Sequence, residues 1–276
     1  MKKLVPVSDE KFEIIKEVYK YDRDLPLEVR QLGLWPWRTP YHLEKVLYRS
    51  THNQMVSASF AKPLKAKGKL PAVLLIHGWN TIWGRFEDWA CDWREVLVKA
   101  GYAVLSADNF DFGERRFSLD SWEKKYKYHG RERIIQSAVD GMRGIDYLAI
   151  RPDIDKSRIA LLGGSLGAYI GAITGAFDKR LKTVILTVIG IFKNDNLVND
   201  KGLDMLVHSA NFISRISPTP LLMVNGKKDE AFPAEGSKLL FDLAGEPKKQ
   251  VWYNTTHFMP PKKYNRDVLA WLKTRL

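Results

Sequence analysis

From about residue 71 to the C-terminus, short apolar runs rich in leucine and β-branched residues alternate with segments of helical periodicity. The apolar runs predict strands at residues 71–76, 102–107, 158–162, 183–189, 220–224 and 250–253. The segments between them predict helices at residues 86–100, 131–149, 166–177, 237–243 and 267–276. Strands that alternate with helices form a mostly parallel sheet covered on both faces, and ligands of such sheets bind outside the carboxyl ends of the strands. We therefore expect the chemistry of this chain in the loops that follow its strands.

The first part of the chain follows a different pattern. Residues 8–21 carry apolar side chains at helical spacing and predict an amphipathic helix; these side chains are Phe12, Ile15, Val18 and Tyr19. Residues 41–50 and 55–61 predict an opening pair of strands. A chain of 276 residues is long enough to bury one large core. We expect a single α/β domain over residues 1–276, with an N-terminal extension of about residues 1–40.

The predicted strand at residues 158–162 is followed by Gly163-Gly164-Ser165-Leu166-Gly167, which fits the pattern Gly-x-Ser-x-Gly. In this pattern a serine nucleophile lies on a sharp strand-to-helix turn, where bulky flanking side chains would clash. Gly163 and Gly167 remove those side chains, and the helix that follows presents free N–H groups beside the serine. The alternative is a glycine-rich turn that only packs a helix against the sheet. The strand-to-helix context favours Ser165 as a nucleophile.

A serine hydroxyl is a poor nucleophile until a base removes its proton. In this arrangement an acid and then a histidine follow the serine along the chain. His208 precedes the strand that should carry the acid, whereas His257 follows the last predicted strand. After the second-last strand Asp229 is the candidate acid and Glu230 the alternative; it would orient His257 and stabilise its charged form. The structural alternatives are a surface histidine at His257 and a turn-capping role for Asp229.

The oxyanion of an acyl-transfer reaction needs two backbone donors. One is expected to be the N–H of Leu166, directly after the nucleophile, and the other the N–H of Trp79, in the loop after the strand at residues 71–76. Gly78 would allow a close backbone approach there. We expect His77 to be a structural hydrogen-bonding residue rather than a catalytic one.

The connection from Ile191 to Pro218 is too long for a simple loop and contains a helical-looking segment at residues 203–213. It leaves the sheet at a strand's carboxyl end, so we predict a small cap, about residues 191–218, over the active site. The predicted walls of the acyl pocket are Trp79, Leu203, Leu206, Val207, Phe212 and Phe258. The alternative is that these side chains pack the segment onto the body. A cap this short predicts a preference for short or aromatic acyl groups.

Composition argues against several other classes of protein. The single cysteine, Cys91, cannot form an internal disulfide, and the sequence has neither zinc-site spacing nor a Walker-type glycine loop, so neither a metal nor another cofactor is expected. No stretch is long and apolar enough for a signal sequence or a membrane span, and a cytoplasmic location with no membrane partner is expected. The net charge of +12 is spread along the chain among acidic residues, which argues against a nucleic-acid partner and weakly favours substrates with a carboxylate. The sequence gives no indication of oligomeric state.

These residues together resemble the α/β-hydrolase superfamily, from about residue 41 to the C-terminus. The resemblance rests on His77-Gly78-Trp79, Gly163 to Gly167, Gly226 to Asp229 and His257-Phe258. Within the superfamily the chain looks most like the dienelactone hydrolase-like and prolyl oligopeptidase-related esterases. The stretch from Asp108 to Glu114 resembles their loop after the next strand but departs from its common Gly-His-Gly-Glu form, so no catalytic role is assigned to it.

The leading hypothesis is a serine esterase that uses a catalytic triad of Ser165, Asp229 and His257 on a small-molecule ester. Dienelactone hydrolases usually carry a cysteine as nucleophile, and Ser165 therefore favours ester hydrolysis. The second hypothesis is a serine peptidase related to prolyl oligopeptidase, whose usual gating domain a 276-residue chain cannot accommodate. The third is a binding protein that kept the fold; a complete triad in the expected order argues against it.

Overall fold

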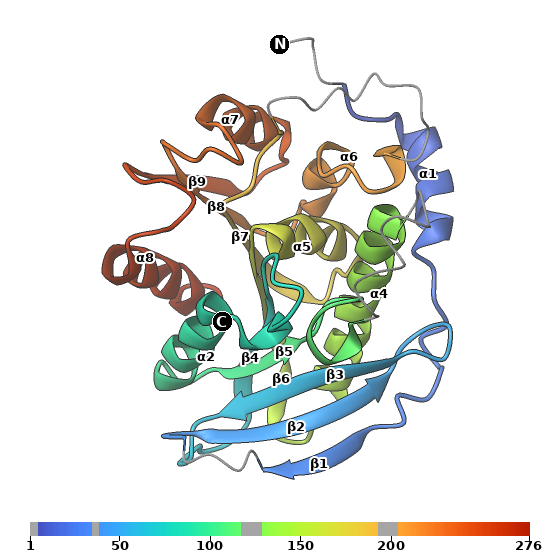
Figure 1. The fold of residues 1–276 in the computed structure, drawn as a ribbon, viewed down its shortest axis with the longest axis vertical. Helices are drawn as coiled ribbons and strands as arrows, with labels where there is room; N and C mark the ends of the chain where they lie inside the picture. The colour runs from blue at the N-terminus through green and yellow to red at the C-terminus, as the bar shows by residue number, and fades with distance from the viewer. Residues whose placement is uncertain (1–4, 35–38, 117–128, 193–203) are drawn as a thin grey trace.

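A computed structural model describes residues 5–34, 39–116, 129–192 and 204–276. Within these ranges, nine strands form one sheet in the order β1-β2-β3-β5-β4-β6-β7-β8-β9 (Figure 1). The strands are β1 (Arg30–Leu34), β2 (His42–Arg49), β3 (Met55–Lys62), β4 (Leu70–Ile76), β5 (Ala103–Ala107), β6 (Ile154–Gly164), β7 (Leu181–Thr187), β8 (Leu221–Gly226) and β9 (Lys248–Tyr253). The pairs β1–β2, β2–β3 and β3–β5 are antiparallel, and all pairs from β5 to β9 are parallel. The predicted mostly parallel α/β sheet is confirmed.

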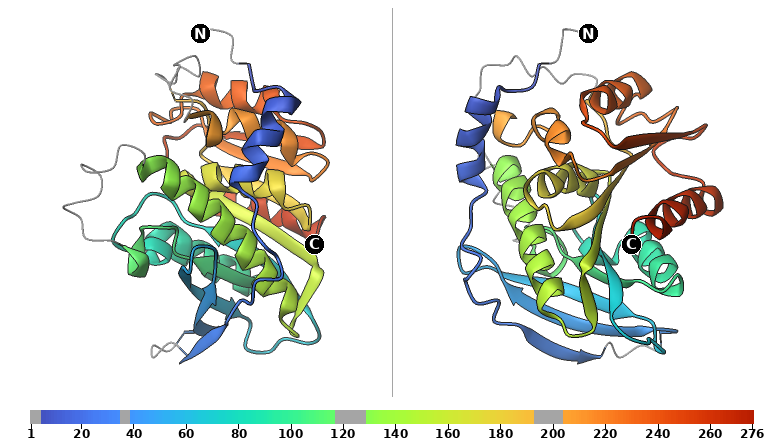
Figure 2. Two further views of the ribbon diagram at one scale, coloured as in Figure 1. Left: turned by 90° about the vertical axis from the view of Figure 1, so that its right-hand side faces the viewer. Right: turned by 180° about the vertical axis from the view of Figure 1, so that it is seen from behind.

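Helices cover both faces of this sheet (Figures 1 and 2). They are α1 (Asp9–Val18), α2 (Asp88–Lys99), α4 (His129–Ile150), α5 (Leu166–Phe177), α6 (Ala210–Ile213), α7 (Ala234–Leu243) and α8 (Pro261–Lys273). One apolar core lies between the sheet and side chains of α1, α4, α5, α6 and α7. The other lies between the opposite face and α2 and α8. Because the central strands are buried on both faces, their sequences are continuous apolar runs rather than alternating ones.

The N-terminal segment is packed into the body of the protein. Helix α1 begins after Ser8, whose hydroxyl accepts a hydrogen bond from the Lys11 N–H, and it buries Phe12 and Ile15. After α1, the Tyr19 ring packs 4.9 Å from that of Phe177 on α5. Strand β1, which the sequence pattern does not indicate, then extends the sheet by pairing with β2. A five-residue edge strand with a glycine in it carries little periodic signal.

The described part of the predicted cap packs beside α1 and α5. Phe212 is fully buried, with its ring 5.6 Å from that of Phe12 and 5.8 Å from that of Phe177. Leu206 and Val207 are half-buried against the same core, and the Tyr19 hydroxyl donates to the Leu206 carbonyl at 2.6 Å. Figure 2 shows α1 running alongside α6. The prediction that Leu206, Val207 and Phe212 wall an acyl pocket is therefore wrong, because α1 supplies the apolar surface on which they are buried. Leu203 lies outside the described residues.

Candidate active site

Ser165 lies on a tight turn between β6 and α5. Its backbone has φ of 53° and ψ of −116°, a conformation that side chains rarely adopt, and its N–H donates to the Thr187 carbonyl at 2.9 Å. A Cβ atom at Gly163 would lie 2.3 Å from the Gly167 carbonyl oxygen, and one at Gly167 would lie 2.0 Å from the Ile76 carbonyl oxygen. Both glycines are therefore required for the turn to form. Strain of this kind is found where a side chain must be held in a particular place.

Three side chains from separate loops meet in one hydrogen-bonded row. His257 Nε2 lies 3.0 Å from Ser165 Oγ, and His257 Nδ1 lies 2.9 Å from Asp229 Oδ2. Asp229 is almost fully buried, and its other oxygen accepts hydrogen bonds from the backbone N–H groups of Ala231 and Phe232 at 2.9 Å each. Glu230 is exposed, so Asp229 is the carboxylate that contacts the imidazole. In this arrangement Nδ1–H donates to the carboxylate and Nε2 is free to accept the serine proton.

Aromatic rings surround the imidazole of His257. The Phe232 ring is stacked 6.0 Å from it, and the Phe258 ring meets it edge-on at 6.1 Å. Phe192, at the end of β7's following loop, lies 4.6 Å from Phe232 between ring centroids. The sequence analysis did not identify Phe232 or Phe192. Phe232 follows the predicted acid by three residues, and that short spacing is the signal that could have identified it.

The two candidate oxyanion donors come from neighbouring loops. Because Gly167 touches the Ile76 carbonyl, the start of α5 lies against the end of β4, whose following loop carries Trp79. Among the residues that the structure describes, neither the Trp79 N–H nor the Leu166 N–H donates a hydrogen bond to a protein acceptor. Both groups are thus available to a ligand. Val188, at the end of β7 beside the turn, also has a positive φ, of 49°, which is rare for a β-branched residue.

His77 fixes the Trp79 loop from below. Its Nδ1–H donates to the Gly78 carbonyl at 2.8 Å, and its Nε2 accepts from the Asn109 N–H at 3.0 Å. The Asn109 side chain in turn donates to the His77 carbonyl at 3.2 Å. Complete burial lowers the pKa of His77 to about 4, so the imidazole is neutral near pH 7. The expectation that His77 is a structural hydrogen-bonding residue is confirmed.

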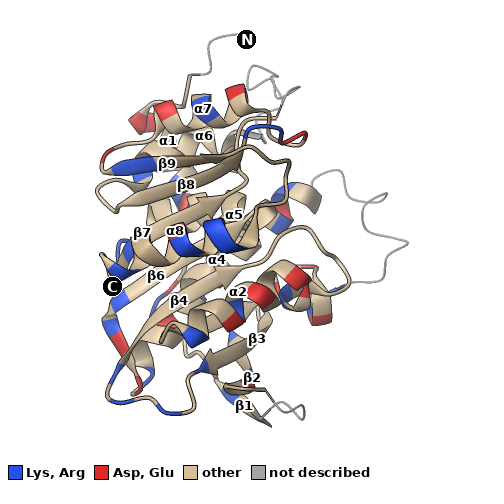
Figure 3. Ribbon diagram, turned by 90° about the vertical axis from the view of Figure 1, so that its left-hand side faces the viewer, with Lys and Arg blue, Asp and Glu red and all other residues tan. Residues whose placement is uncertain are grey.

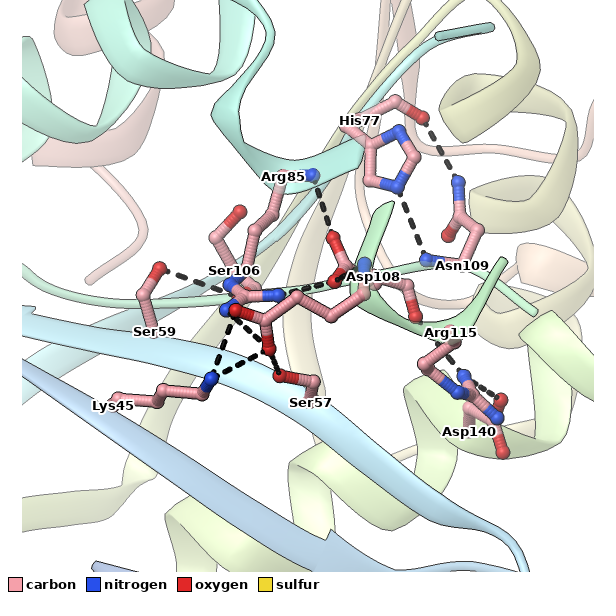
Figure 4. Close-up of polar contacts among 11 residues, drawn as sticks. Lys45, Ser57, Ser59, His77, Arg85, Ser106, Asp108, Asn109, Arg115 and Asp140 are labelled. Atoms are coloured by element: carbon pink, nitrogen blue, oxygen red, sulfur yellow. Dashed lines mark hydrogen bonds and ion pairs between the residues drawn. The ribbon is translucent and has the colours of Figure 1, made fainter. Parts of the chain in front are cut away.

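The loop that begins at Asp108 supports the same region (Figure 4). The buried Asp108 carboxylate accepts from the backbone N–H groups of Arg85 at 2.8 Å and Glu114 at 3.0 Å, and it forms an ion pair with the Arg85 guanidinium. Burial alone would raise the pKa of Glu114, but hydrogen bonds from Lys45 and Ser57 lower it to about 2. This network ties the loops after β4 and β5 to strands β2 and β3. It contacts no member of the Ser165–His257–Asp229 row.

A cleft of about 760 Å³ opens beside Ser165 and His257. Of the predicted pocket residues, Trp79 and Phe258 line it, and Leu206, Val207 and Phe212 do not. One wall is formed by Glu87 and helix α2, and the opposite wall by Phe258, Met259 and the start of α8. The sequence analysis did not predict the α2 wall. No group of three or more potential metal ligands occurs among the described residues, and none of the described helices is long and apolar enough to cross a membrane.

Comparisons with known proteins match this fold. A model of the acetyl xylan esterase (AXE1) family matches residues 12–190, and a model of the serine hydrolase (FSH1) family matches residues 157–269. Acetyl xylan esterase 1 from Thermoanaerobacterium sp. JW/SL YS485 superposes with a TM-score of 0.77 at 14% identity, over 97% of this chain and 94% of that one. The acetyl xylan esterase from Paenibacillus sp. R4 gives 0.76 at 17% identity, over 99% and 96% of the two chains.

Two curated proteins are similar in sequence. YtaP of Bacillus subtilis (strain 168) is 28% identical over 216 residues, which are 70% of this chain and 72% of YtaP. YfhR of Escherichia coli O157:H7 is 30% identical over 149 residues, and the match spans about half of each chain, 50% of this one and 52% of YfhR. The fold and the family matches together define a carboxylic ester hydrolase of the α/β-hydrolase superfamily, as the sequence resemblance implied. Within that superfamily the chain belongs to the acetyl xylan esterase (AXE1) family.

Proposed function

We propose that this esterase acts through an acyl-enzyme formed on Ser165, with His257 as general base and Asp229 as the acid that orients it. The observation that carries the proposal is the continuous row Ser165 Oγ, His257 Nε2, His257 Nδ1 and Asp229 Oδ2, with separations of 3.0 and 2.9 Å. A nucleophile within hydrogen-bonding distance of a base, which a buried carboxylate orients, is the arrangement that nucleophilic acyl transfer needs. The strained backbone at Ser165 supports the same role.

In the acylation half-reaction, Ser165 Oγ attacks the acyl carbon while its proton passes to His257 Nε2. The carbonyl oxygen becomes an oxyanion, which the Leu166 and Trp79 N–H groups stabilise. The bond from the acyl carbon to the alcohol oxygen then breaks, and His257 returns the proton to that oxygen. In deacylation, water attacks the acyl carbon, gives one proton to His257 and forms the carboxylic acid as Ser165 Oγ leaves and recovers that proton.

For the acyl group we propose a short chain or an aromatic ring. Two solved relatives are named acetyl xylan esterases, so acetyl is the first acyl group to test. The indole of Trp79 and the ring of Phe258 border the cleft next to the reacting serine, where they would pack against a small or flat acyl group. This argument replaces the one from the cap, whose described residues lie away from the cleft.

The test is reactivity towards a fluorophosphonate probe together with a substrate panel. Wild type should be labelled at Ser165 and Ser165→Ala should not, with a loss on the order of 10⁴ or more in kcat on p-nitrophenyl acetate. Across p-nitrophenyl acetate, butyrate, octanoate and palmitate, kcat/KM should be greatest for the short chains. Aminoacyl-p-nitroanilides should be poor substrates; faster cleavage of these amides than of the esters would instead support the peptidase hypothesis. Labelling of another serine would refute the assignment of the nucleophile.

A further inference from the structure

The α2 wall of the cleft carries two adjacent stripes of side chains. Residues 88, 92, 95 and 99 recur at helical spacing along one stripe, and they are Asp88, Asp92, Glu95 and Lys99. The neighbouring stripe is apolar and consists of Trp89, Trp93 and Val96. All seven side chains line the cleft that contains Ser165, as does Glu87, the residue that precedes the helix. The wall therefore presents carboxylates directly beside indole rings.

The charge of this wall is opposite to that of the protein. The chain has 44 lysine and arginine residues against 32 acidic ones, yet the cleft is lined by four carboxylates and one lysine from this wall. Lys99 is already paired with Glu95, four residues before it. Asp88 and Asp92 have no cationic partner among the described residues, although like charges four residues apart on a helix repel each other. Their charges are left uncompensated within the cleft.

The opposite wall does not supply the missing cations. Figure 3 shows α2 and α8 side by side, with acidic residues on α2 and basic residues on α8. The residues of α8 that line the cleft are Pro261, Tyr264 and Asn265. Lys262, Lys263 and Arg266 project from the helix about 100° or more away from this face and are exposed to solvent. The basic side chains of α8 therefore lie outside the cleft.

An indole lies next to the nucleophile. A Cβ atom at Gly164 would be 2.7 Å from Trp89 Cζ2, so this ring packs directly on the residue before Ser165. The Trp93 ring meets Tyr264 edge-on at 5.0 Å and joins the two walls at the base of the cleft. Indole faces attract cations, and the attraction is strengthened where carboxylates lie close by and solvent is partly excluded.

The position of Glu87 supports the same conclusion. Its carboxylate accepts a hydrogen bond from the Gly78 N–H at 2.5 Å, one residue before the proposed oxyanion donor Trp79. Burial raises the pKa of Glu87, and the neighbouring Asp88 carboxylate raises it further. A negative charge here disfavours an oxyanion close by, unless a positive group of the substrate offsets it.

From these observations we propose that the cleft selects esters that carry an ammonium group, which binds against Trp89 and the carboxylates of Glu87, Asp88 and Asp92. The inference rests on the proposed function, because it assigns a charge preference to the same site. It replaces the expectation of carboxylate-bearing substrates, which the wall of α2 would repel. Neutral esters remain substrates, but they lack this additional interaction.

The test compares two thioesters of nearly equal shape, S-acetylthiocholine and its neutral carbon analogue S-(3,3-dimethylbutyl) thioacetate. We expect kcat/KM to favour the cation by about tenfold, chiefly through a lower KM, and the preference to shrink as salt is added. The double variant Asp88→Asn/Asp92→Asn should lose most of the preference while keeping its rate on the neutral analogue. Glu235→Gln, which removes an acid from the first turn of α7 far from the cleft, is the matched control and should keep the preference.

Equal kcat/KM values for the two thioesters, or a preference that survives the double variant, would overturn the proposal. So would faster hydrolysis of a neutral sugar acetate than of the thiocholine ester with no effect of the double variant. Binding separates this outcome from failure of the proposed function. Ser165→Ala should bind choline about tenfold more tightly than 3,3-dimethyl-1-butanol in calorimetry. If wild type hydrolyses no ester but this binding difference is present, the proposed mechanism fails and the cation site stands.

Discussion

The guanidinium of Arg133 lies over the indole of Trp79, with Arg133 Cζ 4.9 Å from the ring centroid. Arg133 is almost fully buried near the start of α4, and it forms an ion pair with Asp111 at 2.8 Å. The Phe112 ring lies edge-on to the same indole at 5.4 Å. These contacts connect α4 to the loop whose N–H is proposed to stabilise the oxyanion, so Arg133 is a positioning residue for Trp79.

Replacing Arg133 should therefore affect the chemical step more than substrate binding. We expect Arg133→Met to lower kcat by roughly tenfold with little change in KM, because a misplaced donor stabilises the transition state less well. Arg133→Lys should recover part of the loss, since it keeps the charge but not the planar stacking. Steady-state kinetics on p-nitrophenyl acetate measure both effects.

The matched control is Arg275→Met. Arg275 also lies over an indole, that of Trp271, with its Cζ 3.4 Å from the ring centroid, but this pair is at the end of α8. The control should leave kcat unchanged. A similar loss in both variants, or a loss in Arg133→Met that appears entirely in KM, would contradict a positioning role.

The two adjacent acids after β8 should behave differently. Asp229 is buried and accepts three hydrogen bonds, from His257, Ala231 and Phe232, whereas Glu230 is exposed. Asp229→Asn should lower kcat by about 10³ to 10⁴, because an amide does not hold the imidazole in the required tautomer. Glu230→Gln should stay within about twofold of wild type. If Glu230→Gln proved the more harmful change, the proposed acid would be wrong.

The sequence was most informative where chemistry follows a strand directly. Ser165, Asp229 and His257 could be brought together on paper because each follows a predicted parallel strand, and the carboxyl ends of such strands meet at one edge of the sheet. The structure places these three side chains within hydrogen-bonding distance of one another. The spacing of glycines around Ser165 carried the same information, because the turn excludes any Cβ atom at Gly163 or Gly167.

Contacts between distant segments could not be predicted in this way. Phe212 meets Phe12 across two hundred residues, and nothing in the local pattern shows that α1 lies there rather than solvent. The α2 wall presents a similar problem. Trp89 and Trp93 recur at helical spacing, as in any helix that packs on a core, and the sequence does not reveal that their stripe borders a cleft.

The contact between Gly167 and the end of β4 predicts a large cost for one added methyl group. A Cβ atom there would lie 2.0 Å from the Ile76 carbonyl oxygen and 2.6 Å from that of His77, and backbone atoms cannot move aside as a flexible side chain can. Gly167→Ala should lower the free energy of unfolding by about 1–3 kcal/mol and reduce kcat, since the Leu166 N–H moves with the turn.

Gly130→Ala provides the comparison. Gly130 lies in the first turn of α4, and no described atom is within 4 Å of the Cβ position. This change should be neutral or stabilise the protein by up to about 1 kcal/mol, because alanine favours a helix. Urea unfolding measures both variants, and equal stabilities would show that the turn tolerates the extra methyl group.

His77 should make the stability of the protein depend on pH. Burial lowers the pKa of this imidazole from 6.5 to about 4, so between these values the unfolded chain binds a proton that the folded protein does not. The contribution of His77 to stability is therefore complete above pH 6.5 and is lost as the pH falls towards 4. At pH 5 the loss from this one group amounts to about 2 kcal/mol.

The variant His77→Gln removes this titration. At pH 8 it should be less stable than wild type by about 1–3 kcal/mol, because glutamine does not reproduce both hydrogen bonds, to Gly78 and from Asn109. At pH 5 the difference between the two proteins should shrink by about 2 kcal/mol, since only wild type loses the His77 contribution. The carboxyl groups titrate in both proteins and cancel in the comparison. Urea unfolding of each protein at pH 5 and pH 8 gives the four free energies required, and a difference that stays constant or widens at pH 5 would show that His77 is not held neutral by burial.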